Sequence, residues 1–339
     1  MANQYDFVAV GDIMMDEFIR LQEASVHCNI NKEDCEICMK FADKIPFEGA
    51  YNIPAVGNAA NAAVAAAKLG VTSALMTNLG DDPDGKDSLA ALTKAGVSLE
   101  FVKVHPGRKT NHHYVLWYHD ERTILIKHEN FPYELPDLDD PKWIYLTSMG
   151  ETSLEFHATI ERYLESHPGV KLAFQPGTYQ IRFGTQALAG VYKRTEAFFC
   201  NKEESQRILG TDEEHIHKLI AGIHALGPKI VVVTDGKDGA YVSDGERTWF
   251  TPPYPDPKPP YERTGAGDAF SSTFVSALCL GLDLPTALRW APVNSMSVVQ
   301  SVGAQTGLLT RGEIEKYLAQ APPDYQQKLM ESQDVHVSA

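Results

Sequence analysis

The chain has 339 residues, of which 43% are hydrophobic and 22% charged, an ordinary composition for a globular protein with one large core or two modest cores. Acidic residues outnumber basic ones by 45 to 30, which gives a formal net charge of −15. Nucleic acids and anionic membranes attract Lys and Arg, so this charge argues against both as partners. An anionic small molecule stays open, because a few bases and backbone N–H groups can reverse the potential inside a cleft.

The N-terminal stretch MANQYDFVAVGDIMMDEF has no basic region before its first apolar run and meets acidic residues early, unlike a secretory signal. Elsewhere the chain contains no uninterrupted apolar run of the length that a bilayer requires. These two observations predict a cytoplasmic protein.

Residues 5–11 predict a buried strand, and the alanine-rich residues 58–70 predict a helix that ends at a glycine. A strand over 71–80 and a helix over 84–96 are expected next. Short strands joined by turns are expected over 99–128.

Strand and helix patterns then alternate, which is typical of a parallel sheet covered by helices on both faces. We therefore expect an α/β fold, a doubly wound and mostly parallel sheet flanked by helices, in a single domain over residues 1–320. Segments 17–56 and 98–128 interrupt the alternation and predict a small β-sheet lid. The tail, 321–339, is predicted to be weakly ordered.

Three of the five cysteines, Cys28, Cys35 and Cys38, cluster next to His27. An odd number of cysteines spread thinly along a chain does not indicate a disulfide framework. A zinc site is one interpretation of the cluster, but its second ligand pair usually comes from a separate segment, whereas His27 and Cys28 are adjacent. We predict reduced thiols on a small strand hairpin and no metal site.

The stretch YERTGAGDAFSSTFVSAL, residues 261–278, joins a glycine turn to a helical apolar pattern, so a helix is expected to start near 266–268. The first N–H groups of a helix lack internal partners and carry the positive end of its dipole, which makes an anion site. Asp268 stands inside this site. A carboxylate beside a bound anion is unfavourable unless it has a chemical task, such as accepting a proton from an attacking hydroxyl. The ordinary alternative is a tight turn with a dipole-stabilising acid.

Two better-known glycine loops do not match this turn. A Walker A loop requires Gly-x-x-x-x-Gly-Lys-Ser/Thr, which the chain lacks. The dinucleotide fingerprint requires a third glycine where Phe270 stands, so hydride transfer is a weak hypothesis.

The chain resembles the ribokinase-like (PfkB) family of sugar and nucleoside kinases over about residues 5–317. The resemblance rests on the family signature Gly-Ala-Gly-Asp at 265–268 and on VGNAANAAVAAAKLG at 56–70. Further segments match in family order: GDIMMD at 11–16, GDDPDG at 80–85, an Asn-x-x-Glu signature from Asn201 to Glu204, VVVTDGKDGAYV at 231–242 and SVGAQTG at 301–307.

The resemblance implies a doubly wound α/β domain with a β lid and transfer of the γ-phosphate of ATP to a hydroxymethyl group of a small ribose- or fructose-like sugar. Asp268 would be the general base. The N–H groups of Gly265, Ala266, Gly267 and Asp268 would hold the developing phosphate charge.

Further site residues follow from the same resemblance. The implied sugar-binding residues are Asp16, Gly57, Asn58 and Asn61. The implied nucleotide-binding residues are Asn201, Glu204, Thr234, Gly236, Gly239, Arg263 and Asn294, with Glu204 acting on Mg²⁺ through water. For NKEE at 201–204, a helix N-cap with a capping-box acid is the alternative interpretation.

Two positions depart from the family pattern. Glu262 and Arg263 replace the Asp-Thr that often precedes the signature. Many relatives bind a monovalent cation there, so K⁺ is a further implied cofactor, whereas Arg263 could itself supply charge to the phosphates. Met14 stands where ribokinase has a sugar-binding asparagine, which removes one hydrogen-bonding group from a ribose site.

Two other functions remain open beside a sugar kinase. The first is a nucleoside kinase of the adenosine-kinase type, in which lid aromatics such as Tyr114 and Trp117 would stack on a base. The second, less favoured, is a non-catalytic sensor of nucleotide or sugar. Alternatively, the lid aromatics pack the lid sheet or a dimer contact, and a homodimer through the lid is expected. Arg182 could contact a substrate or lie in a solvated loop.

Overall fold

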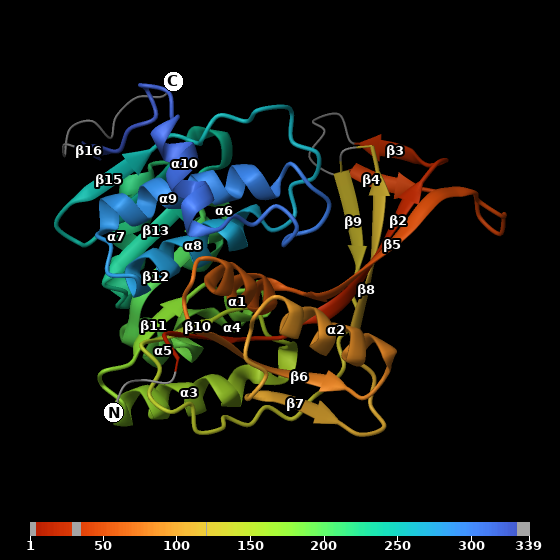
Figure 1. Ribbon diagram of the computed structural model, residues 1–339, viewed down its shortest axis with the longest axis horizontal. Coiled ribbons are helices and arrows are strands. Elements are labelled where there is room, and N and C mark those ends of the chain that lie inside the picture. Colours follow the sequence, from red (N-terminus) through yellow and green to blue (C-terminus); the bar gives the residue numbers. More distant parts are fainter. Residues whose placement is uncertain (1–4, 29–34, 120, 331–339) are drawn as a thin grey trace.

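The computed structural model describes residues 5–28, 35–119 and 121–330. Within these residues, ten strands form one large sheet in the order β16-β15-β14-β13-β12-β11-β10-β1-β6-β7 (Figure 1). The strands from β13 through β7 are parallel to their neighbours, while β14, β15 and β16 are antiparallel. The strands are β1 (Phe7–Val10), β6 (Ser73–Gly80), β7 (Val102–His105), β10 (Trp143–Leu146), β11 (Lys171–Phe174), β12 (Thr195–Asn201), β13 (Ile230–Thr234), β14 (Ala240–Ser243), β15 (Thr248–Thr251) and β16 (Lys328–Met330).

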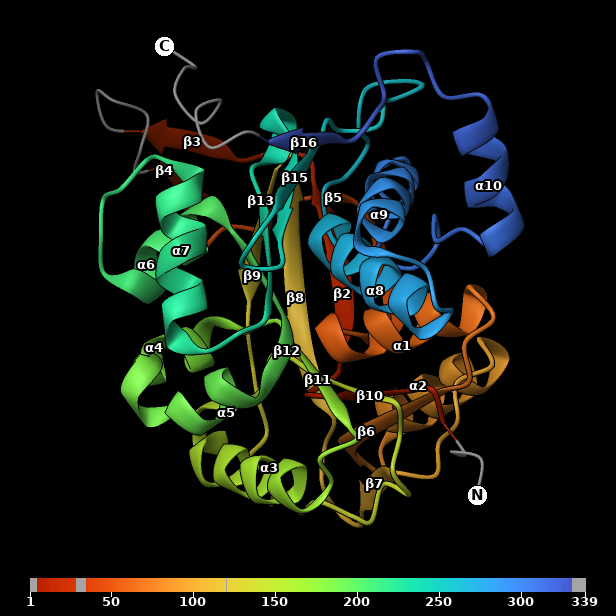
Figure 2. The same ribbon diagram turned by 90° about the vertical axis from the view of Figure 1, so that its left-hand side faces the viewer.

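Helices cover both faces of the sheet (Figure 2). Central strands such as β1 and β6 are buried at every residue, as expected for a sheet that packs on both sides. One face packs against α1 (Asn58–Lys68), α2 (Pro83–Lys94), α8 (Ala266–Cys279), α9 (Leu284–Val298) and α10 (Arg311–Ala319). The other packs against α3 (Leu154–Ser166), α4 (Thr178–Ala187), α5 (Ala189–Arg194), α6 (Lys202–Leu209) and α7 (Ile216–Leu226). Short 3₁₀ turns are η1 (Glu151–Ser153) and η2 (Gly236–Asp238). The predicted doubly wound α/β fold is confirmed.

A second, four-stranded sheet projects from the main body as the predicted lid (Figure 1). Its order is β5-β2-β8-β9, and a separate two-stranded hairpin, β3–β4, lies beside it. The strands are β2 (Met14–Leu21), β3 (Ser25–Cys28), β4 (Cys35–Cys38), β5 (Phe47–Val56), β8 (Asn111–Tyr118) and β9 (Glu121–Leu125). Buried and less buried residues alternate along β8, so one face of the lid packs inward while the other faces outward.

Two segment boundaries differ from the sequence-based expectation. Within the predicted lid segment 98–128, β7 pairs with β6 and so extends the large sheet instead of the lid. In the predicted weakly ordered tail, residues 328–330 form β16 on the edge of the large sheet, and Tyr325 is buried. Residues 331–339 lie outside the described part of the chain.

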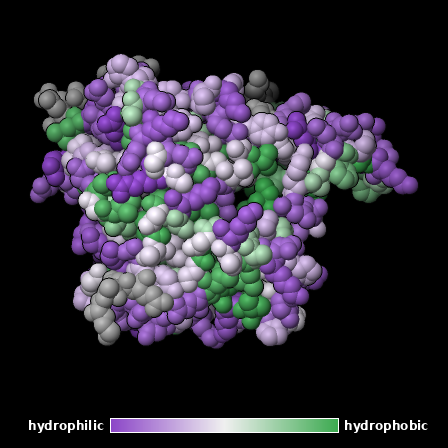
Figure 3. All heavy atoms as spheres, viewed as in Figure 1, coloured by the Kyte–Doolittle hydropathy of each residue, from purple (hydrophilic) through white to green (hydrophobic). Residues whose placement is uncertain are grey.

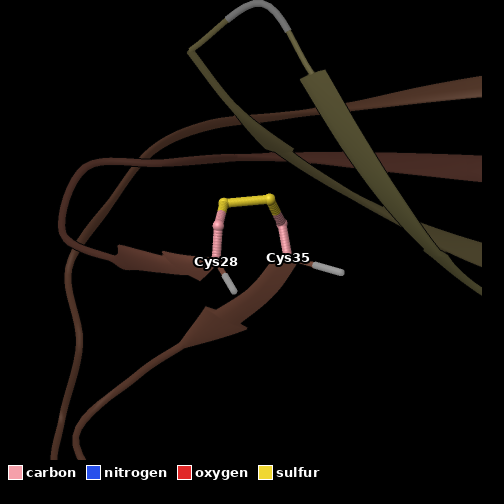
Figure 4. Close-up of a disulfide and its surroundings, with 2 residues drawn as sticks. All are labelled: Cys28 and Cys35. Carbon is pink, nitrogen blue, oxygen red and sulfur yellow. A yellow bond between two sulfur atoms is a disulfide. The ribbon is translucent and has the colours of Figure 1, made fainter. Parts of the chain in front are cut away.

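The cysteine cluster forms the expected small hairpin, but the prediction of reduced thiols is wrong for two of its residues. Cys28 and Cys35 stand directly opposite each other on β3 and β4 and are joined by a disulfide (Figure 4). Cys38, at the end of β4, is a free thiol. The pairing follows from the strand register, which brings the two side chains together across the hairpin.

Among the described residues, no helix combines the length and the apolar character needed to cross a bilayer.

Candidate active site

The glycine turn lies directly before α8, so the predicted helix start near 266–268 is confirmed. Gly265 is the N-cap residue and has a φ of 78°, in the left-handed region that favours glycine. A Cβ added to Gly265 would lie 2.3 Å from the Cβ of Ala304, whereas one added to Gly267 would meet nothing within 4 Å. The turn is therefore packed on one side and open on the other.

Alanine substitutions at the two glycines should separate the folding role of the turn from its ligand role. Gly265→Ala is expected to destabilise the protein by about 1–3 kcal/mol, because it adds a strained φ and a clash. Gly267→Ala is expected to keep the free energy of unfolding within about 1 kcal/mol and still weaken binding of an anion at the turn, because its methyl group stands at the open face. Denaturant unfolding and titration with inorganic phosphate of both variants test this; equal unfolding curves for the two would contradict it.

Asp268 occupies the first turn of α8 and is 9% exposed. The side-chain amide of Asn61 donates to Oδ2 at 2.8 Å, and that of Gln175 donates to Oδ1 at 3.2 Å. Burial raises the pKa of Asp268, the two amide donors lower it, and the nearby Glu204 carboxylate raises it, with a net upward shift. A carboxylate with a raised pKa is a stronger proton acceptor, which suits a general base.

Asn61, one of the predicted sugar-binding residues, contacts the base directly. It lies on α1 and is 4% exposed, and its carbonyl oxygen accepts from the Gln305 amide at 3.0 Å. Asn61 thus holds Asp268 in place through one of the two protons of its amide group.

Gln175, which sequence analysis missed, completes the support of Asp268. It follows β11 directly, and its Oε1 accepts from the Ser271 hydroxyl at 2.9 Å and from the Tyr145 hydroxyl. The signal in the sequence was a polar residue placed directly after a buried strand, because ligands of α/β sheets bind at the carboxyl ends of the strands.

A cavity of about 390 Å³ adjoins Asp268 between the lid and the main body. It brings together four other residues that the resemblance assigned to the sugar: Asp16 from β2, and Gly57, Asn58 and Asn61 at the start of α1. The lid contributes an apolar wall. Its members are Met14, Phe18, Ile124 and Ile126.

Asp16 is the second acid in this cavity and is 8% exposed. Burial raises its pKa to about 7, against a lowering by Arg122, and Glu262 raises it further. His113 Nδ1 lies 3.6 Å from Asp16 Oδ1, and burial lowers the pKa of His113 to about 4. Asp16 Oδ1 and His113 Nε2 have no hydrogen-bond partner within the described chain, so both are placed to meet the hydroxyls of a ligand.

The lid aromatics considered for base stacking do not reach the cavity. Tyr114 is 43% exposed on the outer face of the lid. Trp117 is buried against Tyr261, with ring centroids 5.5 Å apart, and under the Arg20 guanidinium. Arg182 does line the cavity, where its guanidinium lies 5.5 Å from the centre of the Tyr179 ring.

The predicted nucleotide-binding residues gather at the carboxyl ends of two adjacent strands. Asn201 ends β12 and is in register with Thr234, which ends β13. Gly236 begins η2 and Gly239 directly follows it, in the turn after β13, and each has a positive φ. Arg263 is exposed next to the glycine turn. This edge of a parallel sheet is where ligands of α/β proteins bind.

Asn201 and Glu204 form the capping box that was the alternative interpretation of their spacing. The Glu204 N–H donates to Asn201 Oδ1 at 2.7 Å, and the Asn201 N–H donates to Glu204 Oε2 at 2.9 Å. Burial raises the pKa of Glu204. The Glu204 carboxylate in turn raises the pKa of Asp268.

Asn294 is not placed to approach an adenine. It is fully buried on α9, donates to the Thr273 hydroxyl at 2.7 Å, and accepts from the Leu309 N–H at 2.9 Å. A buried amide satisfied at both ends holds α8, α9 and the following loop together, and this corrects the prediction.

Comparison with known proteins decides the family. The family profile described as pfkB family carbohydrate kinase matches residues 23–311. The chain belongs to the pfkB family of carbohydrate kinases. It is therefore a phosphotransferase with an alcohol group as acceptor, from an ATP-using family of sugar and nucleoside kinases.

Individual relatives of this pfkB-family kinase cover most of its length. Ribokinase from Bacillus subtilis (strain 168) is 29% identical over 272 residues, which are 78% of this chain and 87% of the ribokinase. A nucleoside kinase from Methanothermobacter thermautotrophicus is 24% identical over 269 residues, 78% of this chain and 84% of that protein. The structure of Arabidopsis thaliana ribokinase complexed with ribose and ATP has a TM-score of 0.78 at 23% identity and covers 93% of this chain and 98% of that one. This likeness shows the ribokinase-like fold.

Proposed function

We propose that this pfkB-family kinase transfers the γ-phosphate of ATP to a hydroxymethyl group of a small ribose- or fructose-like sugar. The observation that carries the proposal is the position of Asp268, at the N-terminus of α8 and on the wall of the cavity that also holds Asp16 and Asn58. A hydroxyl bound there meets a buried carboxylate on one side and the open N–H groups of a helix on the other.

Asp268 acts as the general base in this proposal. It accepts the proton of the acceptor hydroxyl as the oxygen attacks the γ-phosphorus, while Asn61 and Gln175 fix its two oxygens. Because these amides cannot accept a proton from the carboxylate, the transferred proton stays on Asp268 until the product leaves.

The backbone N–H groups of residues 265–268 form the anion hole. They stand at the start of α8, where helical N–H groups have no internal carbonyl partner. Preorganised donors of this kind stabilise the charge on the transferred phosphoryl group, and phosphoryl transfer depends mainly on such positioning and charge stabilisation.

The nucleotide is expected along the ends of β12 and β13, next to Asn201, Thr234, Gly236 and Gly239, with the exposed Arg263 near its phosphates. Mg²⁺ bound with ATP supplies neutralising charge to the phosphates. Glu204 fits this ion through a water ligand, because Mg²⁺ usually keeps several waters and needs only one or two carboxylates.

The acceptor class has two candidates, of which a sugar is the first. Asp16, His113 and Asn58 offer acceptors and donors for neighbouring hydroxyls. A nucleoside is the alternative, favoured by the apolar wall of Met14, Phe18, Ile124 and Ile126 and by the similarity to a nucleoside kinase.

An ADP-release assay with Mg²⁺ and a panel of sugars and nucleosides tests the proposal. Turnover with one acceptor class, absent from the Asp268→Asn protein, would support it and identify the class. ATP binding without turnover on any panel member would contradict the proposed acceptors.

We also propose that the lid mediates a homodimer. The outer face of β8 and β9 presents Tyr114 and Leu125, which are 43% and 51% exposed. Hydrophobic residues also show on the projecting end of the lid (Figure 3). An open sheet face of this kind is stabilised when a second copy covers it.

Leu125→Glu should shift the protein from dimer to monomer, because a charged side chain would be buried at the contact. Light scattering coupled to size exclusion measures the mass, with the exposed Leu329→Glu on β16 as the matched control. A wild-type mass of one chain would contradict the dimer.

A further inference from the structure

A buried carboxylate that the mechanism above does not use stands directly before the glycine turn. Glu262 is 4% exposed. Its Oε1 accepts from the Thr264 N–H at 2.6 Å and from the Thr264 hydroxyl, and its Oε2 accepts from the Gly303 N–H at 3.2 Å. Several donors thus compensate its burial.

These contacts hold the glycine turn from two sides. Thr264 leads directly into Gly265, while Gly303 precedes Ala304, the residue that packs against Gly265. The position of the Glu262 carboxylate therefore sets the position of the turn whose N–H groups form the proposed anion hole.

The positive charge beside Glu262 comes from the lid. Arg122 on β9 places Nη1 2.9 Å from Glu262 Oε1. The residue before Glu262 makes two more contacts with the lid. Trp117 packs edge-on against the Tyr261 ring, and Arg20 donates to the Tyr261 hydroxyl at 3.3 Å. Strands β2, β8 and β9 of the lid thus dock on residues 261–262.

A monovalent cation does not fit this arrangement of charge. Both oxygens of Glu262 already accept from N–H or O–H donors, and one of those donors is a guanidinium. A K⁺ ion at the carboxylate would stand beside the fixed positive charge of Arg122, and like charges repel strongly where water is excluded.

We propose that Arg122 is a positioning residue that couples closure of the lid to the assembly of the anion hole, its guanidinium standing in place of a monovalent cation beside Glu262. The proposal rests on the proposed kinase function. When the lid is closed, as in this structure, Arg122 meets Glu262, and Glu262 fixes Thr264 and Gly303 around the turn. Opening of the lid removes this charge and loosens the turn, so the phosphate site is fully formed only while the lid is closed.

Three variants test the coupling in the full-length protein. Arg122→Gln removes the charge, and Arg122→Lys keeps it without the planar fork of donors. Arg247→Gln is the matched control, because Arg247 is 61% exposed at its side chain and pairs with Asp244 at the far hairpin β14–β15.

We expect Arg122→Gln to lower kcat about 10–100-fold, because the phosphate site would be displaced, and to change the KM for ATP little. Arg122→Lys should recover part of that loss, and Arg247→Gln should match the wild type.

Two readouts separate coupling from a general loss of stability. In the ligand-free protein, hydrogen exchange of the Thr264 and Gly303 amides should be faster in Arg122→Gln than in Arg247→Gln, with exchange in the core strands unchanged. The wild-type rate should be equal in potassium chloride and in choline chloride at the same ionic strength.

Unchanged exchange at both amides, or a wild-type enzyme that requires K⁺, would overturn the proposal. If the wild type turns over no acceptor, the proposed function fails, while the exchange comparison still decides whether Arg122 controls the turn.

Discussion

Asp268→Asn should lower the rate of phosphate transfer by about 10²–10⁴-fold, the usual contribution of a positioned general base. The reason is that an amide cannot accept the acceptor's proton, although it occupies the same space between Asn61 and Gln175. Binding of the nucleotide should be largely spared, because the N–H groups of the turn belong to the backbone. Initial rates at saturating acceptor, together with titration of ADP by calorimetry, measure the two effects separately.

Asp87→Asn is the matched control for this substitution. Asp87 is exposed on α2, away from the residues that line the cavity, so its loss removes the same charge without touching the site. A rate in Asp268→Asn equal to that of Asp87→Asn would refute the assignment of the base. A large loss of ADP affinity would instead indicate that the carboxylate organises the nucleotide site.

Local sequence patterns predicted the main body of the fold well. The alanine-rich run at 58–70 became α1, and the buried run at 71–80 became β6, because period and composition are properties of one segment. Strand pairing is not such a property. β7 joins the large sheet although its sequence resembles those of the lid strands. β16 pairs with β15 (residues 248–251), a strand that ends 77 residues before β16 begins.

The candidate site could be proposed from the sequence where its residues share a short motif. Asp268 of the glycine turn and Gly57, Asn58 and Asn61 at the start of α1 line the same cavity. His113 and Arg122 come from separate lid strands and Gln175 follows β11, and only the packing of the lid and sheet brings them to the site. For Asn61 and Asn294, the residue type indicated hydrogen bonding but not the partner. Each amide is buried beside another polar side chain and donates to it, Asn61 to Asp268 and Asn294 to Thr273.

Asp16 should make the stability of the ligand-free protein depend on pH. Its folded-state pKa of about 7 lies above the value of 3.8 for an exposed carboxyl, with burial as the largest cause. The folded state therefore binds this proton more tightly than the unfolded state does. The stability from this group is fully present below about pH 4 and is lost as pH rises through about 7, by at most about 4 kcal/mol.

Asp16→Asn should for this reason stabilise the free protein at about pH 8 by about 1–4 kcal/mol and leave it nearly unchanged at about pH 4, because the amide never ionises.

The same substitution should weaken acceptor binding, since an ionised Asp16 offers two oxygens to neighbouring hydroxyls and the amide offers one. In the wild type, kcat/KM for the acceptor should rise as pH passes through about 7, and this rise should be absent from the variant. Denaturant unfolding at the two pH values, with Asp87→Asn as control, measures the first effect, and a pH profile of kcat/KM measures the second. If the variant is less stable than the wild type at the higher pH, Asp16 is held by protein partners. If the variant is more stable and its KM for the acceptor is raised, Asp16 binds the acceptor at a cost in the stability of the free protein.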